Sequence, residues 1–338
     1  MTVMRLVRTR ARALRTLAIS AALLCVAPPY AAARHTAAHG GAIPRIGFLS
    51  LTVPSKNEAG LTERLAQLGY REGENIVIER VYANGNQELL DREAQRLVAS
   101  GVALLYAVSP PGAIAARKAT STVPIVFSSI SNPVGMGLAK SLVHPGGNIT
   151  GVANMPADLN IKRLEMLRDA FPQMRRVALI TRSGNPNHQV NIAAQVAAAR
   201  RLGFEPTVFD LESPTQFEGA FQSMARDGVE AACAVQDTLF FAAREHYMKA
   251  ALRWRIPVIA DGHEYAEAGA LIAYGVDYRR LYLAGANYVD KILKGADPGT
   301  LPIEQPMQLN LVVNVRTSRL LGAPIPRALL VRADRIIE

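Results

Sequence analysis

Two aspartates in this sequence stand where a carboxylate could hold a small molecule. Asp237 follows the apolar run Glu230–Val235, and Asp261 follows Pro257–Ala260. A lone carboxylate directly after a buried strand suits an ammonium group or a hydroxyl-rich ligand. Asp237 could instead cap the helix that follows it, because an aspartate side chain accepts hydrogen bonds from the first amides of a helix. We favour the ligand role.

Hydroxyl groups follow other apolar runs. Ser109 precedes a predicted helix, whose free N–H groups and positive dipole end suit a carboxylate. Its hydroxyl either contacts such an anion or caps the helix, since both use the same geometry. Ser128 and Ser129 can also donate to an anion. The full set of predicted ligand-binding residues is Ser50, Thr52, Ser109, Pro110, Ser128, Ser129, Asn154, Asn185, Asp237 and Asp261.

Residue patterns typical of catalysis and metal binding are missing from the sequence. It has no G-x-S-x-G elbow and no P-loop. His35 and His39 lie in a linker, and the other four histidines show no metal-ligand spacing. Cys233 lies in an apolar run and is expected to be an inert core thiol. We therefore predict no catalytic residue, no metal and no cofactor, and we expect that the protein is not an enzyme.

Two series of short apolar runs and helical patterns must position these side chains. The first series has predicted strands at Arg45–Ser50, Asn75–Tyr82, Val102–Val108 and Pro124–Phe127, and helices at Asn57–Leu68, Gln87–Ser100 and Gly112–Thr120. The second has strands at Arg176–Thr181, Glu205–Asp210, Glu230–Val235, Pro257–Ala260 and Ala270–Tyr274, and helices at Asn187–Leu202, Pro214–Arg226 and Leu239–Arg253. Such alternation predicts βαβ units, parallel sheets and two similar lobes. Ligands of parallel sheets bind beyond the carboxyl ends of the strands, where the predicted residues stand.

The first 33 residues have the pattern of a secretory signal. Met1–Arg15 contains five arginines and no acid, a short apolar run follows at Thr16–Ala27, and Ala31–Ala33 suits a signal peptidase. A mitochondrial transit peptide is the alternative, because it is also rich in arginine. The signal predicts export, and residues 34–44 would form a linker.

Removal of the signal would halve the net charge of the chain. The chain has 38 Lys and Arg against 28 Asp and Glu, a net charge of +10, and five of these arginines lie in the signal. The rest carries +5, spread along the chain, which argues against a nucleic-acid partner. The signal also holds Cys25, so Cys233 would have no disulfide partner in the mature chain.

Longer stretches resemble a known family, the ABC-transporter substrate-binding proteins of the tryptophan/tyrosine type. They include LAQLGYREGENIVIE at 65–79, STVPIVFSSISNPVGMGLAKSLVHPGGNITGV at 121–152, DTLFFAAR at 237–244 and LVVNVRTSRLLG at 311–322. The resemblance covers the chain from Arg45 onward. It implies an α/β fold of two doubly wound, Rossmann-like lobes with parallel sheets, joined by a three-crossover hinge: the type I periplasmic-binding fold.

The resemblance also implies an organisation and a role. Residues 45–151 plus about 277–304 would form the N-terminal lobe, and residues 152–276 plus about 305–338 the C-terminal lobe. Hinge closure would capture a small amino-acid-like, carboxylated or aromatic ligand between them. First-lobe serines would hold its carboxylate, and Asp237 would hold its ammonium group. The partner would be an ABC permease in the inner membrane, the location the periplasm and the state a monomer.

Three features depart from the family pattern. Leu51–Pro54 is more apolar than the usual first loop, Ser109–Gly112 replaces a common Thr-Pro-Ala-type turn, and Arg182 adds a cation near the predicted cleft mouth. Two other functions stay open from the sequence: an exported sensor that presents its ligand to a membrane receptor kinase, and an exported α/β enzyme.

Overall fold

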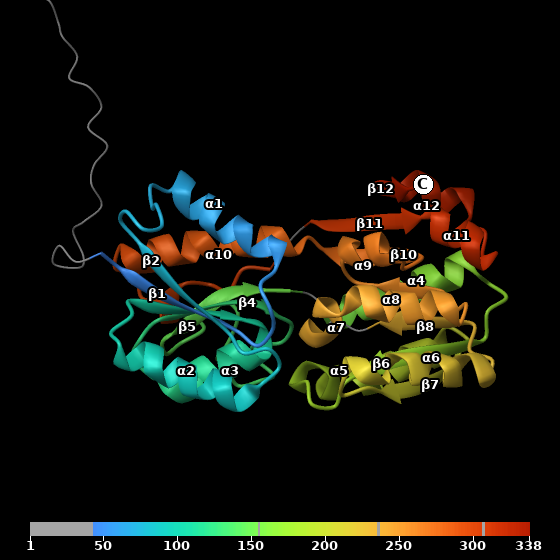
Figure 1. The fold of residues 1–338 in the computed structure, drawn as a ribbon, viewed down its shortest axis with the longest axis horizontal. Coiled ribbons are helices and arrows are strands. Elements are labelled where there is room, and N and C mark those ends of the chain that lie inside the picture. The colour runs from blue at the N-terminus through green and yellow to red at the C-terminus, as the bar shows by residue number, and fades with distance from the viewer. Residues whose placement is uncertain (1–42, 155, 235–236, 306–307) are drawn as a thin grey trace, which may run out of the picture. The chain divides into compact units, whose positions relative to one another are not determined.

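The computed structural model describes residues 43–338 except 155, 235–236 and 306–307 (Figure 1). The predicted signal and all but the end of the linker lie outside these residues. The described chain contains two α/β lobes, each built around a sheet, and the prediction of this fold class is confirmed.

The first sheet consists of five parallel strands in the order β2-β1-β3-β4-β5. Their bounds are Arg45–Ser50 (β1), Val77–Tyr82 (β2), Leu104–Val108 (β3), Ile125–Ile130 (β4) and Ile149–Ala153 (β5). The strands β1, β3, β4 and β5 are rich in apolar residues and almost wholly buried, as parallel strands between helices require, whereas the edge strand β2 is only partly buried.

The second sheet has seven strands in the order β12-β11-β10-β9-β8-β6-β7. Their bounds are Arg176–Thr181 (β6), Glu205–Asp210 (β7), Ala231–Ala234 (β8), Val258–Ala260 (β9), Ile272–Val276 (β10), Leu309–Asn314 (β11) and Arg335–Ile337 (β12). Only the pairing of β10 with β11 is antiparallel among the described strands. The part from β7 to β10 repeats the order of the first sheet, which accounts for the two similar series in the sequence.

Helices cover both faces of each sheet (Figure 1). They are Ala59–Gln67 (α1), Gln87–Ala99 (α2), Ser109–Ala119 (α3), Pro156–Ala170 (α4), Pro186–Arg201 (α5), Phe217–Arg226 (α6), Thr238–Ala242 (α7), Arg244–Arg253 (α8), His263–Ala268 (α9), Tyr278–Leu293 (α10), Val315–Leu321 (α11) and Arg327–Arg332 (α12). Short 3₁₀ turns stand at Lys56–Glu58 (η1), Pro214–Gln216 (η2) and Pro298–Thr300 (η3). No helix in the described part of the chain is both long and apolar enough to cross a membrane.

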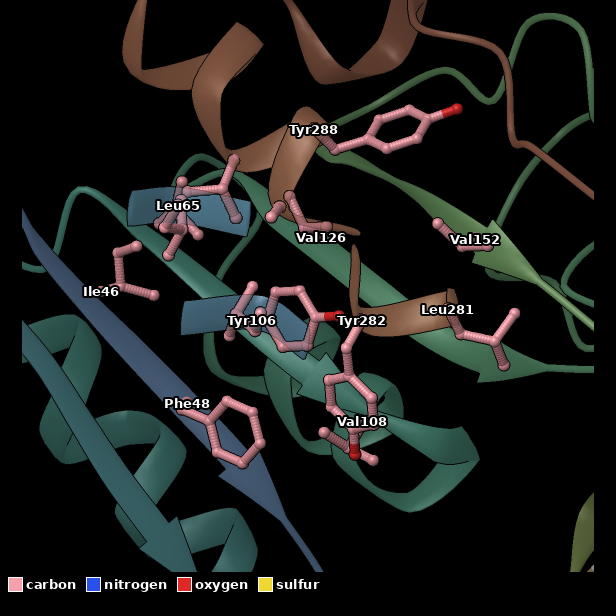
Figure 2. Packing of buried hydrophobic residues seen from close by; sticks show 14 of the residues in the cluster. Ile46, Phe48, Leu65, Tyr106, Val108, Val126, Val152, Leu281, Tyr282 and Tyr288 are labelled. Atoms are coloured by element: carbon pink, nitrogen blue, oxygen red, sulfur yellow. The ribbon is translucent and has the colours of Figure 1, made fainter. Parts of the chain in front are cut away.

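Each face of each sheet has its own apolar core. In the first lobe, α1 and α10 pack on one face, and Figure 2 shows side chains of α10 such as Leu281 and Tyr282 against Phe48 and Tyr106 of the strands. The rings of Phe48 and Tyr106 stack with centroids 5.6 Å apart. The helices α2 and α3 cover the opposite face.

The chain passes between the two sheets three times. It leaves the first sheet after β5 for α4, returns after β10 to α10, and crosses again between η3 and β11. At this last passage Glu304 pairs with Val152 in a parallel bridge, so two of the connections lie side by side.

Three predicted helices differ from the observed ones. The helix predicted at Gly112–Thr120 begins at Ser109, because Pro110 and Pro111 fit the first turn of a helix, where their missing N–H groups are not needed. The helix predicted at Leu239–Arg253 is two helices, α7 and α8, that join at Ala243. The one predicted at Asn57–Leu68 begins as the 3₁₀ turn η1 and continues as α1.

Candidate functional site

A cavity of about 60 Å³ lies where the carboxyl ends of β1, β3 and β4 face the start of α7. Both lobes contribute to its wall, together with α10. The residues that line it are Ser50, Thr52, Ser55, Asn57, Glu58, Val108, Ser109, Ser129, Asp237, Thr238, Phe241, Tyr278, Leu281 and Tyr282. Val108, Leu281 and Tyr282 also belong to the core drawn in Figure 2, so one wall of the cavity is the edge of that core.

Hydroxyl groups from the first lobe form one side of this cavity. The side-chain oxygens of Ser50 and Thr52 lie 3.3 Å apart at the end of β1. The Ser109 hydroxyl is buried and has no hydrogen-bond partner among the described residues. Since a buried hydroxyl without a partner is costly, this group is available to a ligand.

Two of these serines have unusual backbone angles. Ser109 has φ of 59° and Ser129 has φ of 65°, although residues with a side chain rarely adopt positive φ. Such strain gathers at binding sites, where the surrounding structure holds it in place. The backbone therefore marks the same two positions that line the cavity.

The start of α3 supplies fewer amides than the sequence suggested. Val108 is the N-cap, so the interpretation of Ser109 as the capping side chain is wrong. The next two residues of the first turn are Pro110 and Pro111, which have no N–H to donate. The Ser109 hydroxyl is therefore the side-chain donor that this helix start offers to the cavity.

Asp237 lines the cavity, and both of its carboxylate oxygens accept hydrogen bonds from within the protein. Its side chain is inaccessible to solvent. Oδ1 accepts hydrogen bonds from the amides of Leu239 and Phe240, at 2.8 and 3.2 Å, so Asp237 caps α7. Oδ2 accepts hydrogen bonds from Arg182 Nε and Asn185 Nδ2, both at 2.8 Å.

Arg182 differs from its expected position. The sequence placed this cation near a cleft mouth, but Arg182 is buried, with 7% of its surface exposed, and forms an ion pair with Asp237. Its backbone amide also donates to His188 Nδ1 at 2.8 Å, which fixes the loop after β6.

The remaining predicted residues lie behind the cavity wall. Asp261 is buried in the second lobe, where one oxygen accepts a hydrogen bond from the Tyr278 hydroxyl and the other has no described partner. Asn154 donates to Ser129 Oγ at 3.5 Å, and Asn185 donates to Asp237. Ser128 and Pro110 are buried beside their lining neighbours. Thus Ser50, Thr52, Ser109, Ser129 and Asp237 line the cavity, and the other five predicted residues do not.

Sequence reasoning missed the contribution of α10. Tyr278, Leu281 and Tyr282 line the cavity from this helix, and none of them is among the predicted ligand-binding residues. Their spacing of three and four residues places them on one helix face, and that pattern could have identified them. Phe241 also lines the cavity, whereas its neighbour Phe240 is fully buried in the second lobe, so one ring packs in the core and the other reaches the site.

Glu58 is the second acid in the cavity wall. Burial raises the pKa of its carboxyl above the ordinary value, and hydrogen bonds from the Tyr82 hydroxyl and the Ser55 amide lower it in part. These bonds are 2.6 and 3.0 Å long and occupy both carboxyl oxygens. The net effect favours the uncharged form of this acid.

Contacts across the cavity join the two lobes. Asn57 Nδ2 in the first lobe donates to Glu264 Oε1 of α9 at 2.7 Å. The Phe241 ring meets the Tyr278 ring edge to face, with centroids 5.2 Å apart. Among the described residues, no group of three His, Cys, Asp or Glu side chains could hold a metal ion. The arrangement suits recognition of a small molecule by hydroxyl groups and rings.

Comparison with known proteins gives consistent results. A family model described as ABC transporter substrate binding protein matches residues 47–337. A tyrosine-binding protein of Clostridioides difficile (strain R20291) is 26% identical over 267 residues, which are 79% of this chain and 76% of the relative.

Two solved structures share the fold. A conserved domain protein from Vibrio cholerae O1 biovar El Tor is 26% identical with a TM-score of 0.83, over 87% of this chain and 100% of the other. An ABC domain from Streptococcus pneumonia, solved in complex with L-Trp, is 24% identical with a TM-score of 0.81, over 88% and 100%.

Proposed function

The chain belongs to the family of ABC transporter substrate-binding proteins, and from this premise we propose that it is the extracytoplasmic receptor of an ABC importer. It captures a small amino-acid-like, carboxylated or aromatic ligand in the cavity between its lobes. It then delivers this ligand to a permease in the inner membrane. Residues 1–33 direct the chain to the periplasm.

The observation that carries this proposal is the composition of the cavity wall. Two serines with positive φ, Ser109 and Ser129, stand on one side, and the buried Ser109 hydroxyl has no partner among the described residues. The rings of Phe241, Tyr278 and Tyr282 stand on another side. Such a site binds an apolar body and orients it through a few polar contacts, as small-molecule sites commonly do. The ligands named for the relatives, tyrosine and tryptophan, have this combination of a ring and polar groups.

A thermal-shift screen of amino acids, organic acids and aromatic compounds tests the proposal. A ligand that binds only the folded state raises Tm, and a concentration of 100 times Kd adds about 2.7 kcal/mol of stability. The substitution Thr238→Trp, which fills the cavity from α7, is expected to abolish the shift. The substitution Gln222→Trp on the exposed face of α6 is the control and should keep it. A screen in which no compound stabilises the wild type contradicts the proposal.

A further inference from the structure

The acid expected to hold a ligand ammonium group already has a cation beside it. Asp237 is buried and lines the cavity, and Arg182 Nε donates to its Oδ2 at 2.8 Å. The side chain of Arg182 is only 9% exposed, so this ion pair is shielded from solvent. A buried ion pair resists replacement of one partner, because the other would remain charged and unpaired.

The rest of the Asp237 carboxylate is also occupied. A carboxylate has about four lone-pair positions for hydrogen bonds. Asn185 Nδ2 and the amides of Leu239 and Phe240 join Arg182 to give four hydrogen bonds from the described residues. An incoming ammonium group would have to displace at least one of these donors.

The other carboxyl group in the cavity wall does not replace Asp237. Glu58 accepts a hydrogen bond on each oxygen, from the Ser55 amide and the Tyr82 hydroxyl. Glu58 and Asp237 are the only acidic residues that line the cavity, as far as the structure describes the chain. Every carboxyl oxygen in the described wall therefore already accepts at least one hydrogen bond, and Asp237, with four, has no position left for an ammonium group.

Donors for an acceptor group are present instead. The Ser109 hydroxyl is more than nine-tenths buried, lines the cavity and has no described partner. It stands at the start of the 11-residue helix α3, where the helix dipole favours negative charge. Ser50, Thr52 and Ser129 add hydroxyl groups on the same side.

We propose that Arg182 takes the place of a ligand ammonium group at Asp237, so that the cavity selects organic acids without a cationic amine. The acid group binds at the hydroxyl groups around Ser109, and the rest of the molecule contacts Phe241, Tyr278 and Tyr282. This inference rests on the proposed receptor function and narrows its ligand class. Arg182 is a specificity-determining residue that acts through Asp237.

Isothermal titration calorimetry with matched compounds tests this inference. The pairs are L-alanine with propionate, L-phenylalanine with 3-phenylpropionate, L-tyrosine with 3-(4-hydroxyphenyl)propionate, and L-tryptophan with indole-3-propionate. For the pair of compounds whose shared side chain fits the cavity, the wild type should bind the acid without the amine at least tenfold more tightly than the amino acid. Tighter binding of the amino acid in that pair would overturn the inference while leaving the receptor function in place.

The substitution Arg182→Met should change this preference. It removes the cation and leaves Asp237 free for an ammonium group, so the ratio of the two Kd values should shift at least tenfold toward the amino acid. Arg226→Met removes an exposed arginine of the same lobe and should leave the ratio unchanged. If Arg182→Met does not fold, the wild-type ratio alone decides. Binding of none of the eight compounds would also overturn this ligand class, whereas the thermal-shift screen judges the receptor function separately.

Discussion

At the scale of single residues, the ligand preference of the site depends on which polar side chains already form hydrogen bonds within the protein. Five residues that line the cavity could be predicted because each lies at or shortly after the carboxyl end of a strand, and strand ends are visible in a sequence. The Arg182–Asp237 pair could not be predicted, because the two residues are 55 positions apart and sequence spacing does not show that their side chains meet. Asp237 caps α7 through Oδ1 and pairs with Arg182 through Oδ2, so it is not the free acid that the sequence suggested.

Phe241 is expected to limit the size of the ligand. The cavity of about 60 Å³ is smaller than the roughly 150 Å³ that accommodates a benzene ring. Replacing Phe241 with Ala removes a ring from the wall and enlarges the cavity. We therefore expect the affinity for ring-bearing acids, relative to the affinity for propionate, to rise at least about tenfold. Titration calorimetry on the matched compounds measures this change.

The neighbouring Phe240→Ala substitution is the control. Phe240 is fully buried in the second lobe and does not line the cavity, so its loss should cost roughly 3–5 kcal/mol of stability without changing the order of affinities. An unchanged ligand preference in Phe241→Ala would show that this ring does not limit the site.

Glu58 gives the site a dependence on pH. Its pKa is raised in the folded protein, mainly by burial, above the ordinary value of 4.5. The unfolded chain therefore releases this proton at lower pH than the folded protein does. Stability contributed by Glu58 falls as the pH rises from about 4.5 through the raised pKa.

The variant Glu58→Gln lacks this titration. The Tm of the wild type relative to the variant should therefore decrease as the pH rises through that window and become constant above it. Differential scanning calorimetry between pH 4 and pH 8 measures this difference. A difference that increases with pH would mean that the folded protein stabilises the charged form.

At the scale of the elements, alternation along the chain predicted most strands and helices, because local pattern determines them. The start of α3 was misjudged because a pair of prolines suggested a loop, whereas the first turn of a helix tolerates both. The break at Ala243 between α7 and α8 has no signal in composition. The contribution of α10 depends on the chain returning to the first lobe after β10, which the sequence implied only through the family resemblance.

A hydrogen bond between η1 and α9 is expected to strengthen ligand binding. Asn57 Nδ2 donates to Glu264 Oε1 across the cavity, and this bond joins the lobes only when they are close together. The substitution Asn57→Ala removes this hydrogen bond, which contributes about 1 kcal/mol to the binding free energy, and we expect Kd to rise roughly fivefold. The Tm without ligand should stay nearly constant, since no contact within a lobe is lost.

Asn287→Ala is the matched control for this prediction. Asn287 accepts a hydrogen bond from Arg64 Nε at 2.9 Å, and both residues lie in helices of the first lobe, α1 and α10. Its loss should leave Kd unchanged. Equal effects of the two substitutions on Kd would show that the contact between the lobes has no special role in binding.

At the scale of the whole molecule, two sheets that share one five-strand order direct the carboxyl ends of several strands toward one cavity. The doubled series of strands and helices predicted this architecture. It did not predict which residues meet across the cavity, because partners such as Asn57 and Glu264 are 207 residues apart. The assignment of residue ranges to the two lobes stays a prediction, as does the signal in residues 1–33.

Native mass spectrometry of the protein purified without unfolding tests the central claim, capture of one small molecule between the lobes, most directly. We expect the chain mass plus a single ligand of at most a few hundred daltons, bound one to one. The same adduct should persist in Gln222→Trp and disappear in Thr238→Trp, whose side chain fills the cavity. An adduct of equal abundance in folded Thr238→Trp would place the ligand elsewhere and contradict capture in this cavity.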